Sequence, residues 1–416
     1  MQRRSQIRGE DKLRKSSVRA LGIVALSCFF WSPGLAQTAN SDWVTAWGTS
    51  QQGLSQTKVG NATARLIARV TLPGDSIRIR LDNTFGSAPV TFSHATIAPR
   101  IRGAAVAPLI NTLTFGGKNS VTIPAGGTVQ SDPAPLHVDA QEDMAISLFI
   151  AEGNVQPSQH NNAQVTSYLT EDGAGDQTES TDGKPFTGKT TSMFWLKSID
   201  VRPSSPAATI IAFGDSITDG TCTTLDAHDR WEDILAERLD LQTPVRLGVV
   251  NEGIGGNTVT AKPTPPNSPP GQERLDRDVL SHAGVSHVVL FMGTNDIRRG
   301  ASADDVIAGM KDIIARVKAK HIRILGATII PRHSVVPGVA DTGWSAEKTM
   351  IRNRVNAWIR KDAGFDAVLD FDGVVRSAAN PDLLNPAYNC GDGIHPSPIG
   401  YFLMGKSVDV GLFGRR

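Results

Sequence analysis

One serine of the chain follows a predicted buried strand, a position that suits a nucleophile. Ser216 lies in the segment GDSITDG, residues 214–220, directly after an apolar run at residues 208–213. A tight connection from a strand to a helix exposes the hydroxyl and places backbone N–H groups beside it, and a nucleophilic serine needs both. Gly-Asp-Ser is also ordinary turn chemistry. By itself, the segment leaves a nucleophile and a plain turn as equal alternatives.

Three further polar segments also follow apolar runs. They are residues 251–258 (NEGIGGNT), 293–296 (GTND) and 392–395 (DGIH), in this order along the chain. Each has a plain interpretation, as turn glycines, as the start of a helix, or as one of nine histidines. The carboxyl ends of parallel strands, however, meet at one edge of a sheet, where such folds bind their ligands. The four segments together therefore predict a site at that edge.

The elements that must position these segments are alternating apolar strands and amphipathic helices. Continuous apolar runs, typical of buried parallel strands, lie at residues 208–213, 246–250, 287–292, 322–330 and 367–371. Apolar residues recur at helical spacing behind Ser302 and behind Ser345, and a last helix opens with Ser397 and Pro398. Right-handed crossovers then predict a doubly wound, flavodoxin-like domain with three layers, α/β/α.

The N-terminal part has a different pattern, with short β-favouring stretches between Gly, Pro, Asn and Asp. Residues 76–83 (SIRIRLDN) alternate apolar and polar side chains with the period of a half-buried strand, and residues 144–150 repeat the pattern. We expect a β-sandwich or jelly-roll-like domain without helices at residues 37–201. A Pro/Ser-rich linker at residues 202–206 would join it to an α/β domain at residues 207–416.

The first residues have the pattern of an export signal. Seven basic and two acidic residues precede an apolar run at residues 20–31, which is too short to span a bilayer. We expect a signal peptide at residues 1–36, cleaved after Ala36, rather than an uncleaved membrane anchor. Its removal changes the formal net charge from +1 (42 Lys+Arg against 41 Asp+Glu) to about −4 (35 against 39). A secreted or periplasmic protein follows, with no nucleic acid partner and no stable membrane insertion.

The four polar segments resemble the four blocks of the SGNH (GDSL) hydrolases, which are named for a Ser, Gly, Asn and His in this order. The resemblance covers residues 207–410 and all four blocks, with GDSIT in place of GDSL in the first. The β-rich N-terminal part looks like that of the larger, two-domain secreted esterases of this family. The resemblance implies that Ser216 attacks an acyl carbonyl, that His395 acts as general base and then acid, and that Asp392 orients the imidazole.

The resemblance also implies an oxyanion hole. Its donors would be the backbone N–H of Ser216, the backbone N–H of Gly256 and the side-chain amide of Asn295. Gly256 is preferred to Gly255 because the family's glycine stands just before an Asn/Asp-Thr pair, matched here by Asn257 and Thr258. The aspartates beside Ser216 and Asn295, Asp215 and Asp296, are expected to bond backbone groups of their own loops.

Two cysteines remain after the predicted cleavage, Cys222 and Cys390. Both loops would converge on the predicted site of an exported protein, so we expect a disulfide between them, with two free buried thiols as the alternative. No residues have metal-ligand spacing and no phosphate-binding glycine loop follows a strand, so no metal or other cofactor is expected. His160, Trp43 and Trp47 could contact a carbohydrate, but buried structural roles are the preferred interpretation.

These observations together predict a secreted serine esterase that forms an acyl-enzyme. The preferred substrates are esters of short acyl groups, such as acetyl groups on a carbohydrate, and this choice depends on analogy with the β-rich regions of extracellular carbohydrate-active enzymes. A lipase, lysophospholipase or thioesterase with the same triad is an alternative. An alternative of another class is a non-catalytic glycan-binding protein that keeps the fold. The sequence predicts no oligomeric state.

Overall fold

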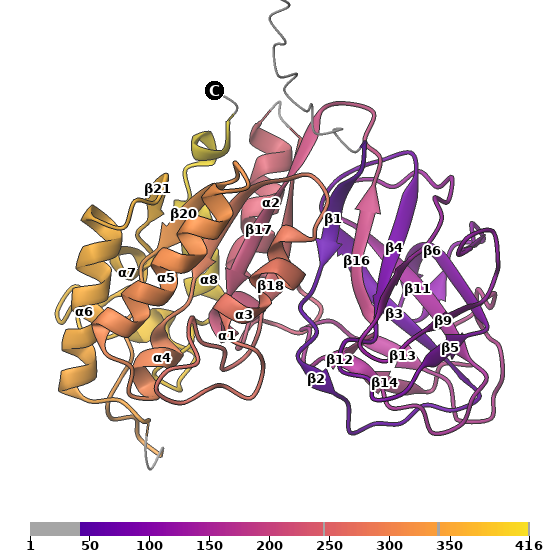
Figure 1. Ribbon diagram of the computed structural model, residues 1–416, viewed down its shortest axis with the longest axis horizontal. Coiled ribbons are helices and arrows are strands. Elements are labelled where there is room, and N and C mark those ends of the chain that lie inside the picture. The colour runs from indigo at the N-terminus through magenta and orange to yellow at the C-terminus, as the bar shows by residue number, and fades with distance from the viewer. Residues whose placement is uncertain (1–41, 244–245, 339–341, 415–416) are drawn as a thin grey trace, which may run out of the picture. The chain divides into compact units, whose positions relative to one another are not determined.

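The apolar runs of the C-terminal half form a five-stranded parallel sheet in a computed structural model, which describes residues 42–243, 246–338 and 342–414 (Figure 1). The strands are β17 (Ala207–Gly214), β18 (Arg246–Gly253), β19 (Val285–Phe291), β20 (Arg323–Ala327) and β21 (Ala367–Leu369). Their order across the sheet is β18-β17-β19-β20-β21, the flavodoxin-like order. The five predicted strands are therefore confirmed.

One predicted strand is shorter than its apolar run. The sequence predicts a strand over residues 322–330, but β20 ends at Ala327. The backbone of Ile329 leaves the sheet because the side chain of Asn356 takes both of its polar groups. Asn356 Oδ1 accepts from the Ile329 N–H at 2.8 Å, and Asn356 Nδ2 donates to the Ile329 carbonyl at 2.8 Å. The side chain of Asn356, which lies on a helix, thus forms the two backbone hydrogen bonds that a neighbouring strand would otherwise form.

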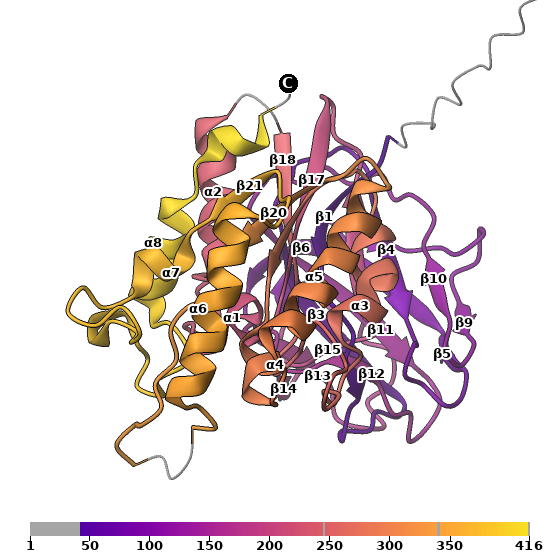
Figure 2. The same cartoon turned by 60° about the vertical axis from the view of Figure 1, so that its left-hand side comes forward.

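Helices cover both faces of this sheet. Figure 2 shows α2 and α8 on one side and α5 on the other. The alternate residues of β17 separate accordingly, since Ile210 and Ala212 belong to one buried apolar core and Ile211 and Phe213 to the other. The helices are α1 (Ser216–Asp219), α2 (Trp231–Gln242), α3 (Gly271–Leu275) with the π-turn η1 (Asp276–Leu280), α4 (Thr294–Arg298), α5 (Ala303–Lys318), α6 (Ala346–Lys361), α7 (Phe371–Val375), α8 (Pro398–Ser407) and the short 3₁₀ turns η2 (Pro386–Tyr388) and η3 (Val410–Phe413).

The predicted caps begin the long helices. Ser302 accepts a hydrogen bond from the Asp305 N–H at the start of α5, and the Asp305 carboxylate accepts one from the Ser302 N–H, which completes a capping box. Ser345 caps α6 by accepting from the Lys348 N–H. Ser397 accepts from the Gly400 N–H, with Pro398 as the first residue of α8. The starts of these three helices could thus be predicted to the residue.

Residues 42–206, here called the β-rich region, contain strands and no helix among the described residues. The strands are β1 (Val44–Gly48), β2 (Gly53–Leu54), β3 (Ala62–Val70), β4 (Ile77–Asp82), β5 (Val90–Phe92), β6 (His94–Arg102), β7 (Ala105–Val106), β8 (Asn111–Thr112), β9 (Val121–Ile123), β10 (Thr128–Gln130), β11 (Glu142–Ile150), β12 (Ser158–His160), β13 (Ser167–Leu169), β14 (Gly188–Thr190), β15 (Met193–Phe194) and β16 (Leu196–Val201). The first strand pairs with the last, with Val44 opposite Val201.

Two sheets account for most of these strands. One has the order β1-β16-β4-β10, and the other has the order β14-β13-β3-β11-β6-β7. Alternate residues of both, such as Ile79 of β4 and Ile146 of β11, are buried in a single apolar core. The β-rich character is thus confirmed, and the assignment as a β-sandwich or jelly roll stays a prediction.

The β-rich region and the following residues 207–414, here called the α/β region, belong to one compact unit. Hydrogen bonds cross between them, for example from the Thr209 hydroxyl to the Thr45 carbonyl at 2.8 Å. The division at residues 202–206 stays a prediction. The predicted signal peptide, residues 1–36, lies outside the described residues. No helix in the part of the chain that the structure describes is long and apolar enough to cross a bilayer.

Candidate active site

Ser216 lies at the carboxyl edge of the sheet, as the first residue of α1 and two residues after β17. Gly214 allows this tight connection, because a Cβ there would lie 2.1 Å from the Thr218 hydroxyl and 2.8 Å from the Phe291 carbonyl oxygen. Asp215 caps α1 by accepting from the Ile217 N–H at 3.0 Å, within its own loop as expected. Ser216 is therefore fixed in a strand-to-helix turn, with 9% of its surface exposed.

His395 and Asp392 approach Ser216 from the loop before α8. His395 Nε2 lies 2.8 Å from Ser216 Oγ, and His395 Nδ1 lies 2.5 Å from Asp392 Oδ2. Asp392 Oδ1 accepts from the backbone N–H groups of Ile394 and His395, at 2.8 and 2.9 Å. The carboxylate therefore holds both the histidine ring and the turn that carries it. The structure brings all three residues together, although the serine and the histidine lie 179 positions apart.

The hydrogen-bond partners fix the proton positions in this chain of contacts. Burial raises the pKa of Asp392. The hydrogen bond and charge of His395 and the two backbone N–H groups lower this pKa by more than burial raises it, so that it falls to about 2. Asp392 is thus an acceptor, so Nδ1 of His395 carries a proton. In the neutral ring, Nε2 is then free to accept the proton of the Ser216 hydroxyl. This arrangement can deprotonate a serine that attacks a carbonyl carbon.

Two backbone N–H groups beside the serine are available to an oxyanion. Among the described residues, the N–H groups of Ser216 and Gly256 have no hydrogen-bond partner. The N–H of Gly255, in contrast, donates to Asp219 Oδ2 at 3.0 Å. Gly256 has a φ of 72°, in the left-handed region that favours glycine. Of the two glycines, only Gly256 thus has a free donor, which supports its assignment to the oxyanion hole.

Asn295 contacts the loop that carries Gly256. It follows Gly293, whose φ is 128°, at the start of α4. Its Nδ2 donates to the Asn257 carbonyl at 3.0 Å, and since this nitrogen carries two hydrogens, one remains for a ligand. The side chain that could contact an oxyanion is therefore oriented by the loop that carries Gly256.

The expectation for Asp296 was wrong in one respect. Asp296 accepts hydrogen bonds from the backbone N–H groups of Val259 and Thr260, at 2.9 and 3.0 Å, rather than from its own loop. The side chain is fully buried, and this burial raises the pKa of Asp296 to about 7. The residue therefore ties the loop of the third polar segment to that of the second.

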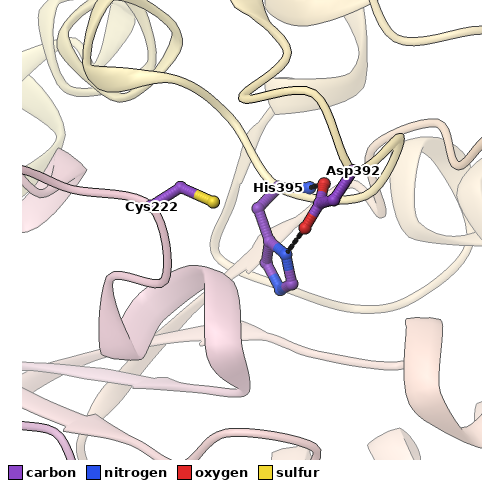
Figure 3. Close-up of side chains that lie close together, drawn as sticks. All are labelled: Cys222, Asp392 and His395. Carbon is purple, nitrogen blue, oxygen red and sulfur yellow. Dashed lines mark hydrogen bonds and ion pairs between the residues drawn. The ribbon is translucent and has the colours of Figure 1, made fainter. Parts of the chain in front are cut away.

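Cys222 and Cys390 form a disulfide, as expected, with their Cα atoms 6.2 Å apart. The bond joins the loop after α1 to the loop of Asp392 and His395. Cys222, Asp392 and His395 are also the only group in the described part of the chain whose ligand atoms could surround a metal ion (Figure 3). The sulfur of Cys222 is bonded to Cys390 and Nδ1 of His395 to Asp392, so this donor set does not fit a metal.

Sequence reasoning missed Asp219 and Arg274, which support the site together with His160, for which a buried structural role was the preferred interpretation. The Asp219 carboxylate accepts a hydrogen bond from the Gly255 N–H, and its Oδ1 lies 2.9 Å from His160 Nε2. Arg274 Nε donates to Asn257 Oδ1 at 3.1 Å. All three side chains are buried. The only local indication was the spacing of Arg274 and Asp278, which is typical of an ion pair on a helix. Of the three aromatic candidates for carbohydrate contact, His160 and Trp43 are buried and Trp47 is partly buried.

Comparisons with known proteins show which family this part of the chain is similar to. Residues 212–403 match the model of the GDSL-like Lipase/Acylhydrolase family. A comparison with curated proteins gave no significant match.

Several solved structures are similar over about half of the chain. A member of the lipolytic protein G-D-S-L family from Veillonella parvula DSM 2008 is 21% identical, with a TM-score of 0.36 over 48% of this chain and 96% of that chain. A carbohydrate acetylesterase family member from Sinorhizobium meliloti is 19% identical, with a TM-score of 0.38 over 48% and 94%. The native M. smegmatis aryl esterase is 21% identical, with a TM-score of 0.38 over 48% and 96%.

Proposed function

Because residues 212–403 match the model of the GDSL-like lipase/acylhydrolase family, we propose that the protein is a serine esterase in which Ser216, His395 and Asp392 form the catalytic triad. The observation that carries this proposal is the continuous chain of contacts from Ser216 Oγ to His395 Nε2, and from His395 Nδ1 to Asp392 Oδ2. A glycan-binding protein would need neither the contacts nor the free N–H groups beside the serine.

Acylation begins when Ser216 Oγ attacks the ester carbonyl carbon and its proton moves to His395 Nε2. Asp392, ionised because its pKa is about 2, stabilises the imidazolium that forms. The negative charge on the carbonyl oxygen is met by the N–H groups of Ser216 and Gly256 and by Asn295 Nδ2. The tetrahedral intermediate then collapses: the carbon–oxygen bond of the ester breaks, and His395 gives its proton to the leaving alcohol.

Deacylation repeats these steps with water as the nucleophile. His395 Nε2 takes a proton from the water that attacks the acyl-enzyme, and the same donors stabilise the second oxyanion. Collapse of this intermediate breaks the bond to Ser216 Oγ, which recovers its proton from His395. The products are the free acid and the enzyme in its starting state, so a ping-pong course is expected.

A cavity beside the catalytic loop supports a short acyl ester of a polyhydroxylated alcohol as substrate. The cavity has a volume of about 310 Å³, and five of its eight lining residues are polar: Arg332, Ser334, Thr349, Asn353 and Asp382. It adjoins the catalytic loop, because the His333 N–H donates to the Gly393 carbonyl at 2.8 Å. Arg332 is buried, and its Nε has no partner among the described residues. Polar side chains that can donate and accept hydrogen bonds suit a sugar better than a fatty acyl chain.

The disulfide supports an oxidising compartment, which agrees with export by the predicted signal peptide. Disulfides persist in secreted and periplasmic proteins and are rare in the reducing cytosol of most organisms. We therefore propose that residues 1–36 direct export and that the mature enzyme acts outside the cytosol.

The test is hydrolysis of p-nitrophenyl esters from acetyl to palmitoyl by the wild type, by Ser216→Ala and by Ser377→Ala. The last is a matched control, since the Ser377 hydroxyl accepts from the Asn380 N–H of its own loop and the backbone bond of Ser377 to the Leu383 carbonyl is kept in the variant. We expect the wild type and the control to hydrolyse the acetyl ester best, and Ser216→Ala to lose at least a thousandfold in kcat. Equal rates for the wild type and Ser216→Ala would refute the triad. A preference for palmitoyl would favour the lipase alternative.

A further inference from the structure

A histidine of the β-rich region contacts the first helix of the α/β region. His160, at the end of β12, is 2% exposed. Its Nδ1 lies 2.8 Å from the Ser50 carbonyl oxygen and its Nε2 lies 2.9 Å from Asp219 Oδ1. Both partners accept, so both ring nitrogens donate and the ring is an imidazolium. Burial lowers the pKa of His160, but the charge and hydrogen bond of Asp219 raise it more, so that the net shift is upward.

Asp219 links His160 to the loop of the proposed oxyanion hole. It is the last residue of α1, the helix that begins with Ser216. Its Oδ1 faces His160, and its Oδ2 accepts from the Gly255 N–H at 3.0 Å. One carboxylate thus connects the helix of the proposed nucleophile, the β-rich region and the residue before Gly256. The hydrogen bond to Gly255 fixes the peptide plane that precedes the free N–H of Gly256.

A second connection reaches the same loop from Ser50. The Ser50 hydroxyl accepts from Arg274 Nη1 at 2.9 Å, and Arg274 is fully buried. Arg274 Nε donates to Asn257 Oδ1 at 3.1 Å, and Arg274 Nη2 donates to the Gly214 carbonyl at 2.8 Å. The backbone carbonyl of Asn257 in turn orients the Asn295 amide. Ser50 therefore contacts both connections, one through its carbonyl and one through its hydroxyl.

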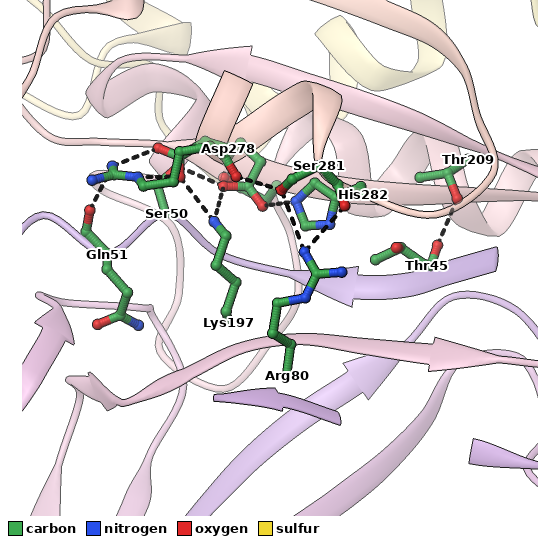
Figure 4. A network of polar contacts seen from close by, with 12 residues as sticks. Thr45, Ser50, Gln51, Arg80, Lys197, Thr209, Asp278, Ser281 and His282 are labelled. Carbon is green, nitrogen blue, oxygen red and sulfur yellow. Dashed lines mark hydrogen bonds and ion pairs between the residues drawn. The ribbon is translucent and has the colours of Figure 1, made fainter. Parts of the chain in front are cut away.

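Ser50, from which both connections start, belongs to a network of buried charged side chains. Figure 4 shows Ser50 and Lys197 of the β-rich region in one polar network with Asp278 and His282 of the α/β region. Lys197 Nζ donates to Asp278 Oδ1 at 2.8 Å, and neither side chain is exposed by more than 2%. Removing one partner of such a buried pair would leave an uncompensated charge. The position of Ser50 relative to the loop is therefore well defined.

From these contacts we propose that the β-rich region is part of the catalytic apparatus, with His160 and Ser50 as positioning residues for the oxyanion loop Gly255–Asn257. The inference rests on the proposed esterase function. His160 and Ser50 touch no reacting atom and act through Asp219 and Arg274. Without His160, the Asp219 carboxylate loses its charged partner, so it turns toward other donors and releases the Gly255 N–H. The Gly256 N–H then no longer points at the developing oxyanion.

The expected effect is a loss of transition-state stabilisation without a loss of substrate binding. Complete removal of an oxyanion donor lowers kcat by about 10² to 10³. A donor that is misaligned rather than removed should lower kcat by roughly 10 to 100-fold in His160→Ala, with KM changed by less than about twofold. His160→Gln keeps one N–H donor near Asp219, so part of the activity should return. Ser50→Ala, which removes only the hydroxyl, should lower kcat by roughly 3 to 10-fold.

A matched control comes from another contact between the same two regions. The Thr71 hydroxyl has two acceptors, the Ala46 carbonyl at 2.7 Å and the Val249 carbonyl at 3.2 Å, and it accepts from the Val249 N–H at 3.0 Å, in the middle of β18. Thr71→Val removes these bonds at nearly constant volume but does not touch the oxyanion loop. A purely structural interface would make this variant and the His160 variants equally slow. Under the proposal, Thr71→Val keeps the wild-type kcat.

The experiment measures kcat and KM with p-nitrophenyl acetate, together with inhibition by phenylboronic acid, whose adduct with the serine mimics the tetrahedral intermediate. In the His160 and Ser50 variants, the inhibition constant should rise by the factor by which kcat/KM falls. Wild-type kcat in both His160→Gln and Ser50→Ala, or an equal loss in Thr71→Val, would overturn the inference. Ser216→Ala is measured in parallel, and unchanged activity there would overturn the proposed function itself. If His160→Ala does not fold, His160→Gln and Ser50→Ala decide the question.

Discussion

The Cys222–Cys390 disulfide should stabilise the fold strongly, and replacing both cysteines by serine tests this. The bond closes a loop between residues 168 positions apart. In the chain-entropy relation, a loop of this length corresponds to about 5 kcal/mol at 25 °C, and native disulfides typically contribute about 2 to 5 kcal/mol. We therefore expect the double variant to lose about 2 to 5 kcal/mol in its free energy of unfolding.

The loss of catalytic activity should be much smaller than the loss of stability. Each of the two loops keeps another contact: the Thr221 carbonyl accepts from the Tyr401 hydroxyl of α8 at 2.7 Å, and within the second loop the Cys390 N–H donates to the His395 carbonyl at 3.1 Å. Because these contacts remain, the relation of Ser216 to His395 should be loosened rather than lost. We expect kcat to fall by less than about tenfold at a temperature where the variant is folded.

Urea denaturation followed by circular dichroism gives the free energy of unfolding of the wild type and the double variant, and the esterase assay gives kcat. Thiol titration of the unfolded, unreduced wild type should find neither Cys222 nor Cys390 free. Two free thiols would refute the disulfide in solution. An unchanged denaturation midpoint with an intact bond would refute the entropic argument, because it would mean that the crosslink does not restrict the unfolded chain.

Two further predictions concern the loops around the serine. Asn295→Ala should lower kcat by about 10² to 10³ at unchanged KM and, through loss of the bond to the Asn257 carbonyl, cost about 1 kcal/mol of stability. Steady-state kinetics that show less than a tenfold change would contradict this role. Burial raises the pKa of Asp215 to about 6 and that of Asp296 to about 7, so the folded state binds protons more tightly than the unfolded state. The free energy of unfolding should therefore fall as pH rises from about 4 to about 7. Asp296→Asn should flatten this slope in urea titrations at each pH, and an unchanged slope would contradict the assignment.

Much of the α/β region could be predicted because its signals are local. Continuous apolar runs such as 208–213 identify buried parallel strands, and Ser302, Ser345 and Ser397 identify helix starts. The topology then brings the ends of successive strands to one edge of the sheet. Ser216 lies at this edge for this reason. His395 does not directly follow a strand, because α7 and η2 separate it from β21, yet its Nε2 reaches Ser216 Oγ at 2.8 Å.

The supporting contacts could not be predicted because they join segments without a common pattern. His160 and Asp219 lie 59 positions apart, and Ser50 and Arg274 lie 224 positions apart. A buried polar side chain finds its partner through the packing of two regions, and neither residue type nor spacing encodes that packing. The shortening of β20 has the same origin, since Asn356 binds the Ile329 backbone from a helix.

The pairing of β1 with β16 has a consequence for the order in which the chain folds. Val44 lies opposite Val201, so the first strand of the β-rich region has no sheet partner until the last one has been made. At roughly 5 to 20 residues per second, synthesis of the intervening chain takes about ten to thirty seconds. During this time β1 lacks its strand partner, and we expect this contact of high sequence separation to close late. Ser50 follows β1 closely in sequence, so we expect the anchoring of the proposed oxyanion loop to be completed late in folding as well.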